Sequence, residues 1–508
     1  MRDVIVAGAL SLIAWVSPAW AEPVMPLKLV IANAKIGNQP ALAMSLTFHV
    51  GAKDQAILHL PNEWANEKEL WRGIKQLRVD NATFAPGADP LTRVLNYQPG
   101  TEQLTVSWMI EQEYKGEPNF TDAKSLFRAT VNDHMVVAAM QTILPSIEIA
   151  PGVVIGLDPN PRTAQPLLCN LTITFEGFPK SWALATPFGN AASQTANAIP
   201  CDALWDSNLA LGDFRVQEAH DAHGSVRLAV RGTWALSDEA LLSKFVAGRA
   251  AAADAFRDNG PEQLLISLAA TPPLPKGNAV FGTAFSYGFF GFATPNAGLS
   301  SLKVWWNHEQ VHYWIPNRLG QLAPGTEAGL AWFNEGFTDY FSLLNAYRTH
   351  ELTAKALGEE MLERVVNGYL KSPARLAPNA KIAEGFWNDR ALQQLPYQRG
   401  ALLALNWDAE IKKSSNAAHS LADVIAELAD QAHEDPNILL TPSRIAEAAR
   451  TLGVANAAGD IASYIEAGRL LTPRDDVFGP CAKYDKAKNT LVAASGAWES
   501  AACASWLK

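Results

Sequence analysis

The sequence is poor in cysteine and has no excess of positive charge, and each shortage excludes a class of protein. Its 508 residues contain four cysteines, none of them in a C-x-x-C pair or at zinc-finger spacing with histidine, which argues against a structural zinc held by cysteine. The net charge is −10 and the pI is about 5.5, so we do not expect the basic face that a nucleic-acid partner needs. The chain also has no low-complexity tract and no repeat of fixed period, which excludes repeat architectures.

Long hydrophobic runs are missing too, apart from one at the N-terminus. Arg2 is followed by an apolar run over residues 4–16 and then by Ala19-Trp20-Ala21, the pattern of a secretory signal peptide over 1–21. The run is shorter than the ~20 residues of a membrane-spanning helix, and no later stretch is long and apolar enough to form one. We therefore expect an exported protein, periplasmic or secreted, with no stable membrane anchor after cleavage.

An oxidising destination would allow the four cysteines to form disulfides. Four cysteines permit three connectivities, but in this sequence they are clustered as two and two. This clustering favours the pairs Cys169–Cys201 and Cys481–Cys503. The alternative is buried free thiols.

Composition and hydrophobic patterning predict a multidomain α+β protein. With 48% hydrophobic and 18% charged residues, a chain of this length should form two or three domains. Residues 22–205 carry short alternating runs separated by Pro, Gly, Asn and Asp, which predict an N-terminal antiparallel β-sandwich-like domain. Residues 206–453 carry helical patterns, among them a long helix over 236–257. Residues 454–508 would form a short C-terminal segment with the second cysteine pair.

The stretch 305–340 concentrates the residues that could carry chemistry. It contains a match to H-E-x-x-H at His308, Glu309 and His312. On a helix over 301–315 the two histidines lie on one face, one turn apart, so both imidazoles could bind one tetrahedral Zn²⁺. Glu309 would point about 100° away around the helix, where it could take a proton from the metal's water.

A catalytic zinc also needs a third protein ligand and an open fourth position. We predict that Glu335 is this ligand, because apolar residues flank it as at the start of a second packed helix. Four residues on, Asp339 would share its helix face and could fix the orientation and tautomer of a ligand histidine. The alternative is a pair of histidines at the edge of the core, with no metal.

The longer string resembles a known family. H-E-x-x-H followed by a glutamate on the next helix is the gluzincin pattern of thermolysin-like metallopeptidases. The segments H-Y-W, N-R-L and W-F-N-E-G-F-T-D-Y over 312–340 look most like the glycyl aminopeptidase family, metallopeptidase family sixty-one. The 22 residues between His312 and Glu335 fit this family's longer connector better than that of alanyl and leucyl aminopeptidases.

This resemblance implies the fold and activity of the second domain. Residues 206–453 would be a thermolysin-like, mainly helical zinc peptidase domain that hydrolyses peptide or protein substrates. The family prefers small N-terminal residues. Many members also carry a PDZ-type module near the C-terminus, but too few residues remain here for one.

A second resemblance lies at 395–401, which is similar to the P-Y-x-K-G segment of related aminopeptidases. The tyrosine of that segment hydrogen-bonds the tetrahedral intermediate. We therefore expect this role for Tyr397, with Arg399 in place of the usual lysine. The alternative is an ordinary aromatic residue at the start of a helix.

The strand expected over 281–291 bears on the type of activity, but it does not decide between the alternatives. In gluzincins it edges the cleft and pairs with substrate backbone, which makes Gly282, Thr283 and Ala284 the predicted cleft residues. Aminopeptidases of this clan carry an acid there for the substrate's α-amine, whereas this stretch has no Asp or Glu. An ammonium in a partly desolvated cleft needs a carboxylate partner, and Glu327 is one candidate. Aminopeptidase, zinc endopeptidase and a peptide-binding gluzincin scaffold without hydrolytic activity all stay open.

Two further motifs have simpler explanations. His220 and His223 flank an acid but have no third ligand, so we expect a solvated loop. Ser286 lies in an A-x-S-x-G string, a variant of the nucleophile elbow, which requires a helix directly after the serine. Gly291 and Pro295 argue against such a helix.

Overall fold

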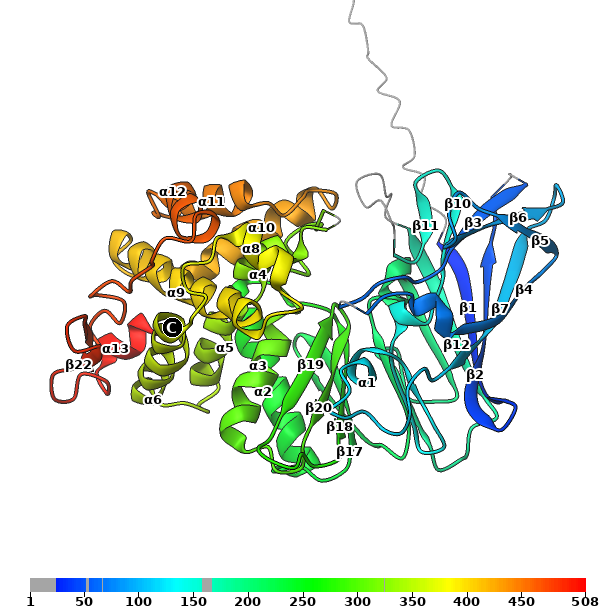
Figure 1. Cartoon of the computed structure of the whole chain (residues 1–508), viewed down its shortest axis with the longest axis horizontal. Helices are drawn as coiled ribbons and strands as arrows, with labels where there is room; N and C mark the ends of the chain where they lie inside the picture. Colours follow the sequence, from blue (N-terminus) through cyan, green and yellow to red (C-terminus); the bar gives the residue numbers. More distant parts are fainter. Residues whose placement is uncertain (1–23, 52–53, 66, 158–166, 324) are drawn as a thin grey trace, which may run out of the picture.

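The computed structural model describes residues 24–508 except 52–53, 66, 158–166 and 324. The N-terminal β-rich part lies at one end of the molecule and the helices lie at the other (Figure 1). The predicted signal peptide, 1–21, is outside the described residues, so export stays a prediction. Of the helices within these ranges, none is both long and apolar enough to cross a membrane.

Two sheets form most of the N-terminal part. The first has the order β14-β12-β1-β2-β7-β4, with the bounds β14 (Ser193–Pro200), β12 (Leu168–Glu176), β1 (Met25–Ile36), β2 (Gln39–His49), β7 (Gln103–Glu111) and β4 (Ile74–Asp80). The second has the order β11-β10-β3-β6-β5, with the bounds β11 (Val153–Ile155), β10 (Ser146–Ala150), β3 (Gln55–His59), β6 (Thr92–Tyr97) and β5 (Ala82–Pro86). Their alternating apolar residues, such as Leu29, Leu46 and Leu58, share one buried core, because successive strand residues face opposite sides. This confirms the predicted N-terminal β domain.

One strand pair differs from the antiparallel prediction. β1 runs parallel to β12, whereas β1 and β2 form an antiparallel hairpin. A parallel pair needs a long crossover connection, and here the second sheet is formed by the chain between the two strands.

Two more sheets join the N-terminal part to the helices. One has the order β13-β15-β9-β8, with the bounds β13 (Ala183–Ala185), β15 (Asn208–Gly212), β9 (Met135–Ala139) and β8 (Thr130–Val131). The other has the order β16-β17-β18-β20-β19, with the bounds β16 (Arg215–Asp221), β17 (Gly224–Arg231), β18 (Gln263–Ala270), β20 (Gly288–Ala293) and β19 (Val280–Phe285). A shared hydrophobic cluster, with Val137 from β9 and Phe290 from β20, fills the space between them. The predicted domain boundary at residue 205 stays a prediction.

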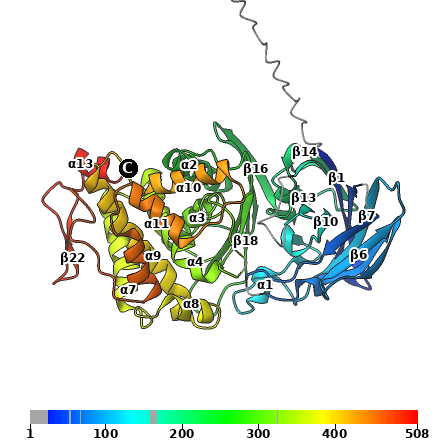
Figure 2. The ribbon, with the colours of Figure 1, turned by 90° about the horizontal axis from the view of Figure 1, so that it is seen from above.

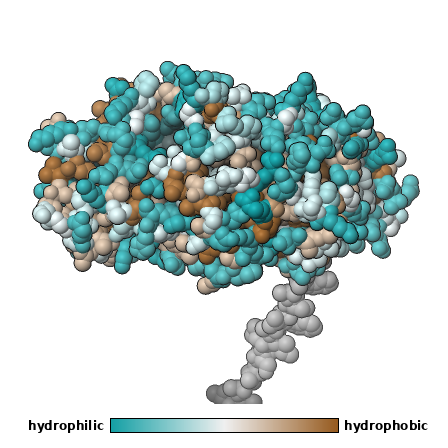
Figure 3. Space-filling model, turned by 90° about the horizontal axis from the view of Figure 1, so that it is seen from below, coloured by the Kyte–Doolittle hydropathy of each residue, from teal (hydrophilic) through white to brown (hydrophobic). Residues whose placement is uncertain are grey.

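Helices cover the side of the β16–β20 sheet that faces away from the N-terminal part (Figure 2). The larger ones are α2 (Asp238–Phe256), α3 (Leu299–Val311), α4 (Glu327–Asn334), α5 (Gly336–Arg348), α9 (Arg390–Ser414), α10 (Leu421–Glu434) and α11 (Pro442–Thr451). The shorter elements are α1 (Lys124–Phe127), α6 (Ala354–Glu360), α7 (Gly368–Lys371), α8 (Asn379–Gly385), α12 (Ala457–Asp460), α13 (Ala501–Trp506), η1 (Leu70–Gly73), η2 (Met140–Thr142), η4 (Cys201–Leu204), η5 (Met361–Asn367), η6 (Ile461–Glu466), β21 (Lys483–Asp485) and β22 (Thr490–Val492). The outer surface seen in Figure 3 is largely hydrophilic, with hydrophobic side chains in scattered groups.

The predicted long helix is confirmed as α2. Its N-cap is Ser237, whose hydroxyl accepts the backbone N–H of Ala240 at 3.3 Å. The helix predicted over 301–315 is observed as α3, which begins at Leu299 and ends earlier than predicted, at Val311. Turns follow it, and Pro316 in those turns has no N–H with which to continue a helix.

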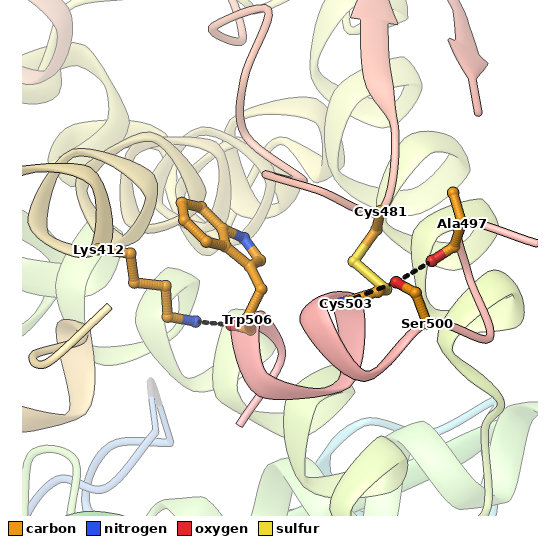
Figure 4. Close-up of a disulfide and its surroundings, with 6 residues drawn as sticks. All are labelled: Lys412, Cys481, Ala497, Ser500, Cys503 and Trp506. Atoms are coloured by element: carbon orange, nitrogen blue, oxygen red, sulfur yellow. Dashed lines mark hydrogen bonds between the residues drawn. A yellow bond between two sulfur atoms is a disulfide. The ribbon is translucent and has the colours of Figure 1, made fainter. Parts of the chain in front are cut away.

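Both predicted disulfides are present. Cys169–Cys201 joins β12 to η4, and Cys481–Cys503 ties the segment before β21 to α13. Figure 4 shows the second bond beside Trp506, whose carbonyl oxygen accepts a hydrogen bond from Lys412 Nζ at 2.6 Å. The C-terminal segment is therefore attached to α9 by a hydrogen bond and closed on itself by a covalent bond.

Removing this second disulfide should lower the stability of the helical part. The Cys481→Ser, Cys503→Ser double variant frees a loop whose ends are 22 residues apart, which corresponds to a loss of about 3 kcal/mol through the entropy of the unfolded chain. We expect the Tm of the helical part, measured by calorimetry, to fall by ~6–12 °C. A Tm equal to that of the wild type would contradict this role.

Candidate metal centre

The end of α3 places two histidines side by side. His308 lies in the last turn of the helix and His312 follows its end, so both imidazoles project from one face. Their Nε2 atoms are 3.0 Å apart, and the two rings are nearly perpendicular, at 87°. The two nitrogen lone pairs can therefore point at one common position.

Glu335 completes the group from the junction of α4 and α5. Its Oε2 lies 3.3 Å from His308 Nε2 and 3.4 Å from His312 Nε2. In the part of the chain that the structure describes, these are the His, Cys, Asp or Glu side chains that could jointly hold a metal ion. The structure thus brings together the three residues that the sequence predicted as ligands, although Glu335 lies between two helices rather than inside one.

Each histidine is oriented by an oxygen on the far side of its ring. His308 Nδ1 donates to Asp339 Oδ1 at 2.8 Å, and His312 Nδ1 donates to the carbonyl oxygen of Ile315 at 2.7 Å. A proton on Nδ1 leaves Nε2 free as a ligand. Asp339 lies where the sequence predicted it. The Ile315 carbonyl was missed, because any residue in that turn would supply it.

The donor set fits a catalytic zinc ion. Tetrahedral Zn²⁺ with bonds of about 2.0–2.2 Å requires ligand atoms ~3.4 Å apart, close to the 3.0, 3.3 and 3.4 Å found here. The ligand side chains keep 12%, 12% and 23% of their surface exposed. Two imidazoles and one carboxylate that remain open to solvent on one side are typical of a catalytic rather than a structural site.

The charges around these ligands suit a cation. Burial would raise the pKa of Glu335, but the charges and hydrogen bonds of His312 and His308 hold it well below its ordinary value. Burial would lower the pKa of His308, but its bonds to Asp339 and Glu335 raise it well above the usual range. Glu335 therefore stays ionised over the whole physiological range.

Glu309 lies beside the ligands and against the edge strand β19. A Cβ atom added to Gly282 would lie 2.5 Å from Glu309 Oε1, so the missing side chain leaves room for the carboxylate. Burial raises the pKa of Glu309, while the neighbouring imidazoles of His308 and His312 oppose the rise. The predicted cleft residue Gly282 and the predicted base Glu309 are thus neighbours.

Trp305 is a neighbour of Glu309 for which no role was predicted from the sequence. Its indole lies where Cβ atoms of Gly282 and Gly291 would be, and it stacks on Trp234 with the ring planes 8° apart. Its position four residues before Glu309 places it on the same helix face, and this spacing is a signal that could have identified it.

Tyr397 stacks on His308, the first of the two histidines. Its ring centroid is 5.9 Å from that of His308, with the planes 22° apart. Burial, together with the carboxylates of Glu335, Asp339 and Glu309, raises its pKa well above the ordinary value, so its hydroxyl remains a hydrogen-bond donor.

The position of Tyr397 in its helix differs from one of the two predictions made from the sequence, while its catalytic role stays a prediction. α9 begins at Arg390, so Tyr397 is in the helix interior and the helix-start alternative is wrong. Arg399 is fully buried and donates to the Ala377 carbonyl oxygen at 2.7 Å, outside the metal centre.

Two glycines set the distance between Glu335 and Tyr397, and sequence reasoning missed both. A Cβ on Gly336 would lie 2.5 Å from the Cα of Gly400, and a Cβ on Gly400 would lie 1.8 Å from the Trp332 carbonyl oxygen. The α4–α5 junction and α9 therefore touch backbone to backbone. This contact brings Glu335 and Tyr397 close to each other.

The remaining sequence predictions lie outside this group of side chains. Glu327 begins α4, about 12 Å along the helix axis from Glu335, and its role toward an α-amine stays a prediction. Ser286 is in the turn of the β19–β20 hairpin, so the nucleophile elbow is excluded. His220 lies in β16 with its side chain 74% exposed, and His223 lies in the turn that follows, so this solvated stretch is a strand and a turn rather than the predicted loop.

Comparison by sequence finds no matching family model and no matching curated protein. By structure, the chain is similar to an aminopeptidase N family protein from Idiomarina loihiensis, with a TM-score of 0.69 and 14% identity over 90% of this chain and 78% of that one. It is also similar to an M1 zinc metallopeptidase from Deinococcus radiodurans, with a TM-score of 0.55 and 15% identity over 88% of this chain and 94% of that one. A mutant two-domain M1 zinc metallopeptidase bound to L-arginine gives a TM-score of 0.54 at 15% identity, with the same coverage.

At this level of identity the likeness shows the fold. The assignment to the glycyl aminopeptidase family stays a prediction. The predicted fold class is confirmed: the chain has the two-part architecture of M1-type zinc metallopeptidases, a β-sheet domain followed by a helical domain.

Proposed function

We propose that this protein is an exported, Zn²⁺-dependent peptidase. The observation that carries the proposal is the convergence of three ligand atoms within 4.8 Å of one another. Glu309 and Tyr397 beside them support it, because a protein that only bound peptides would need neither side chain. The similarity in fold to structures described as zinc metallopeptidases adds further support.

In the proposed hydrolysis of a peptide bond, different side chains bind the metal and transfer the proton. His308, His312 and Glu335 would hold Zn²⁺, which supplies a Lewis acid that polarises the scissile carbonyl and makes water acidic enough to attack it. Glu309 accepts the proton of the attacking water and later delivers it to the leaving amine. Burial raises the pKa of Glu309 above its ordinary value, and a carboxylate with a higher pKa is a stronger proton acceptor.

Two further groups act on the substrate itself. Tyr397 donates its O–H to the oxygen that becomes negative when water adds to the carbonyl. Among the described residues β19 is the last strand of its sheet and pairs with β20, so its outer edge can align an extended peptide through backbone hydrogen bonds. On this strand Gly282, Thr283 and Ala284 are the proposed substrate-binding residues.

The choice between an exopeptidase and an endopeptidase depends on the substrate's N-terminus. The predicted family resemblance favours an aminopeptidase that prefers small N-terminal residues. β19 favours an endopeptidase, because the strand carries no Asp or Glu that could pair with the α-ammonium of a substrate.

A panel of peptides with free and blocked N-termini tests the proposal. Cleavage of free peptides alone indicates an aminopeptidase, and cleavage of both kinds indicates an endopeptidase. Cleavage of neither by zinc-loaded protein would reject the peptidase. The His308→Ala variant, which should lose both activity and stoichiometric zinc by elemental analysis, is the metal-free control.

Tyr397→Phe should separate the role of the hydroxyl from that of the ring. We expect kcat to fall ~10²–10³-fold, as when one oxyanion donor is removed, with KM and zinc content nearly unchanged because the ring still packs on His308. Tyr347, which is half-buried on α5, provides the control variant Tyr347→Phe. Equal kcat values for the two variants would refute the assignment.

A further inference from the structure

A buried pair of asparagines connects the two helices that frame the metal centre. Asn307 precedes His308 on α3, and Asn345 lies on α5, the helix that begins directly after Glu335. Asn345 Nδ2 donates to Asn307 Oδ1 at 2.9 Å and to the Gly248 carbonyl oxygen on α2 at 2.9 Å. Each asparagine has 1% of its surface exposed. One amide group therefore ties α5 to both α3 and α2.

Glu351 extends this pair into a network. It lies just after α5, its side chain is 5% exposed, and its Oε2 accepts Asn307 Nδ2 at 2.9 Å and Trp306 Nε1 at 3.2 Å. Its Oε1 lies 3.4 Å from Lys244 Nζ on α2. Asn307 Nδ2 also donates to the Lys303 carbonyl oxygen within α3, at 2.8 Å. Polar groups inside an apolar core are thus joined across three helices.

This network can specify register where hydrophobic packing does not. α2, α3 and α5 share one large core of apolar side chains, and such side chains tolerate rearrangement as long as volume and pattern are kept. A slip of α3 along α5 by one turn, about 5.4 Å, would separate Asn307 from Asn345 and leave buried amides without partners, which is costly. The same slip would carry His308 and His312 away from Glu335.

We infer that Asn307, Asn345 and Glu351 are positioning residues for the metal centre. They fix the register of α3 on α5, so that the two imidazoles from one helix meet the carboxylate at the start of the other. A single buried asparagine fixes the register of some coiled coils in the same way, at a cost in stability. The inference rests on the proposed function, because it takes His308, His312 and Glu335 to be zinc ligands.

Zinc affinity, measured by competition with a chelator, tests this role without reference to activity. Asn345→Leu keeps the side-chain volume and removes the amide, and we expect it to weaken Zn²⁺ binding ~10–100-fold, as loss of groups that orient metal ligands does. In the Asn307→Leu, Asn345→Leu double variant the loss of affinity should be smaller than the product of the two single losses, because both substitutions break the bond between Asn307 and Asn345.

Asn406 provides the matched control. It is a buried asparagine on α9 that donates to the Thr472 carbonyl oxygen at 3.0 Å and accepts the Arg474 N–H at 3.0 Å, but it connects neither α3 nor α5. Asn406→Leu should lower the Tm while Zn²⁺ affinity stays within about twofold of the wild type. If Asn345→Leu behaves in the same way, the network is merely structural and the inference is overturned.

Variants of Glu351 provide a second test in case the Asn345→Leu variant does not fold. Glu351→Gln retains an oxygen acceptor for Asn307 and Trp306 and should bind Zn²⁺ like the wild type, whereas Glu351→Leu should bind more weakly. Equal affinity of these two variants would also overturn the inference. Failure of the wild-type protein to bind Zn²⁺ at all would reject the proposed function itself.

Discussion

Glu309→Gln should reduce kcat by ~10²–10⁴-fold, the usual contribution of general acid–base catalysis, and leave the zinc content unchanged. Glutamine has nearly the same shape as glutamate, so it fits in the space beside Gly282, but its amide cannot accept the proton of the attacking water. Glu309 is also not among the ligand atoms that converge on the metal position. The binding of Zn²⁺ should therefore be independent of this substitution.

The measurement combines steady-state kinetics on a cleaved peptide with elemental analysis of the purified variant. Glu359→Gln is the control, because this glutamate is on α6 with its side chain 63% exposed. A Glu309→Gln variant with wild-type kcat would remove the base assignment. A variant that had lost its zinc would instead indicate that Glu309 helps to hold the metal.

Gly400→Ala should destabilise the protein by about 3–5 kcal/mol, the range of severe single substitutions. The new Cβ would lie 1.8 Å from the Trp332 carbonyl oxygen and 2.9 Å from the Cα of Gly336. Both are backbone atoms, so no side-chain rotation can relieve the overlap, and α9 would have to move away from the α4–α5 junction. The same movement would separate Tyr397 from Glu335, so activity should fall together with stability.

Gly329→Ala is the matched control for this prediction. Gly329 lies inside α4, and a Cβ there would meet nothing within 4 Å. In open space the substitution should stabilise the helix by ~0.5–1 kcal/mol, because alanine loses less backbone entropy on folding. Urea unfolding followed by circular dichroism measures both changes. A Gly400→Ala variant as stable as Gly329→Ala would show that the helices do not need this close approach.

The features predicted correctly from the sequence are those encoded by residues that are close to one another in the chain. Ser237 followed by an acidic first turn is sufficient to place the start of α2, and four-residue spacing is sufficient to place His308 and His312 on one face. The two cysteine pairs were correct because each pair is close in sequence. For the same reason Asp339, four residues after Glu335, lies on the face that turns toward the histidines.

The features that were missed depend on contacts between distant segments. No local pattern distinguishes Gly400 from a glycine that merely weakens a helix. Glycine is required at this position because the Trp332 carbonyl oxygen of another helix leaves no room for a side chain. From the sequence alone, Asn345 is a residue of low helix propensity. Its function as a hydrogen-bond partner is visible only when Asn307 of another helix lies opposite it. The parallel pairing of β1 with β12 likewise depends on how the chain returns after it has formed the second sheet.

The amino-acid sequence by itself determined which residues could hold a metal ion and move a proton, since residue type and spacing within a helix are local properties. Only the tertiary structure decided that Glu335, Tyr397 and β19 meet those residues, because the meeting requires helices α3, α5 and α9 to pack in one register. That register depends on backbone contacts at Gly336 and Gly400 and on the hydrogen bond between Asn307 and Asn345. These contacts join segments far apart in the chain, so the residue pattern within a single helix or strand does not reveal them.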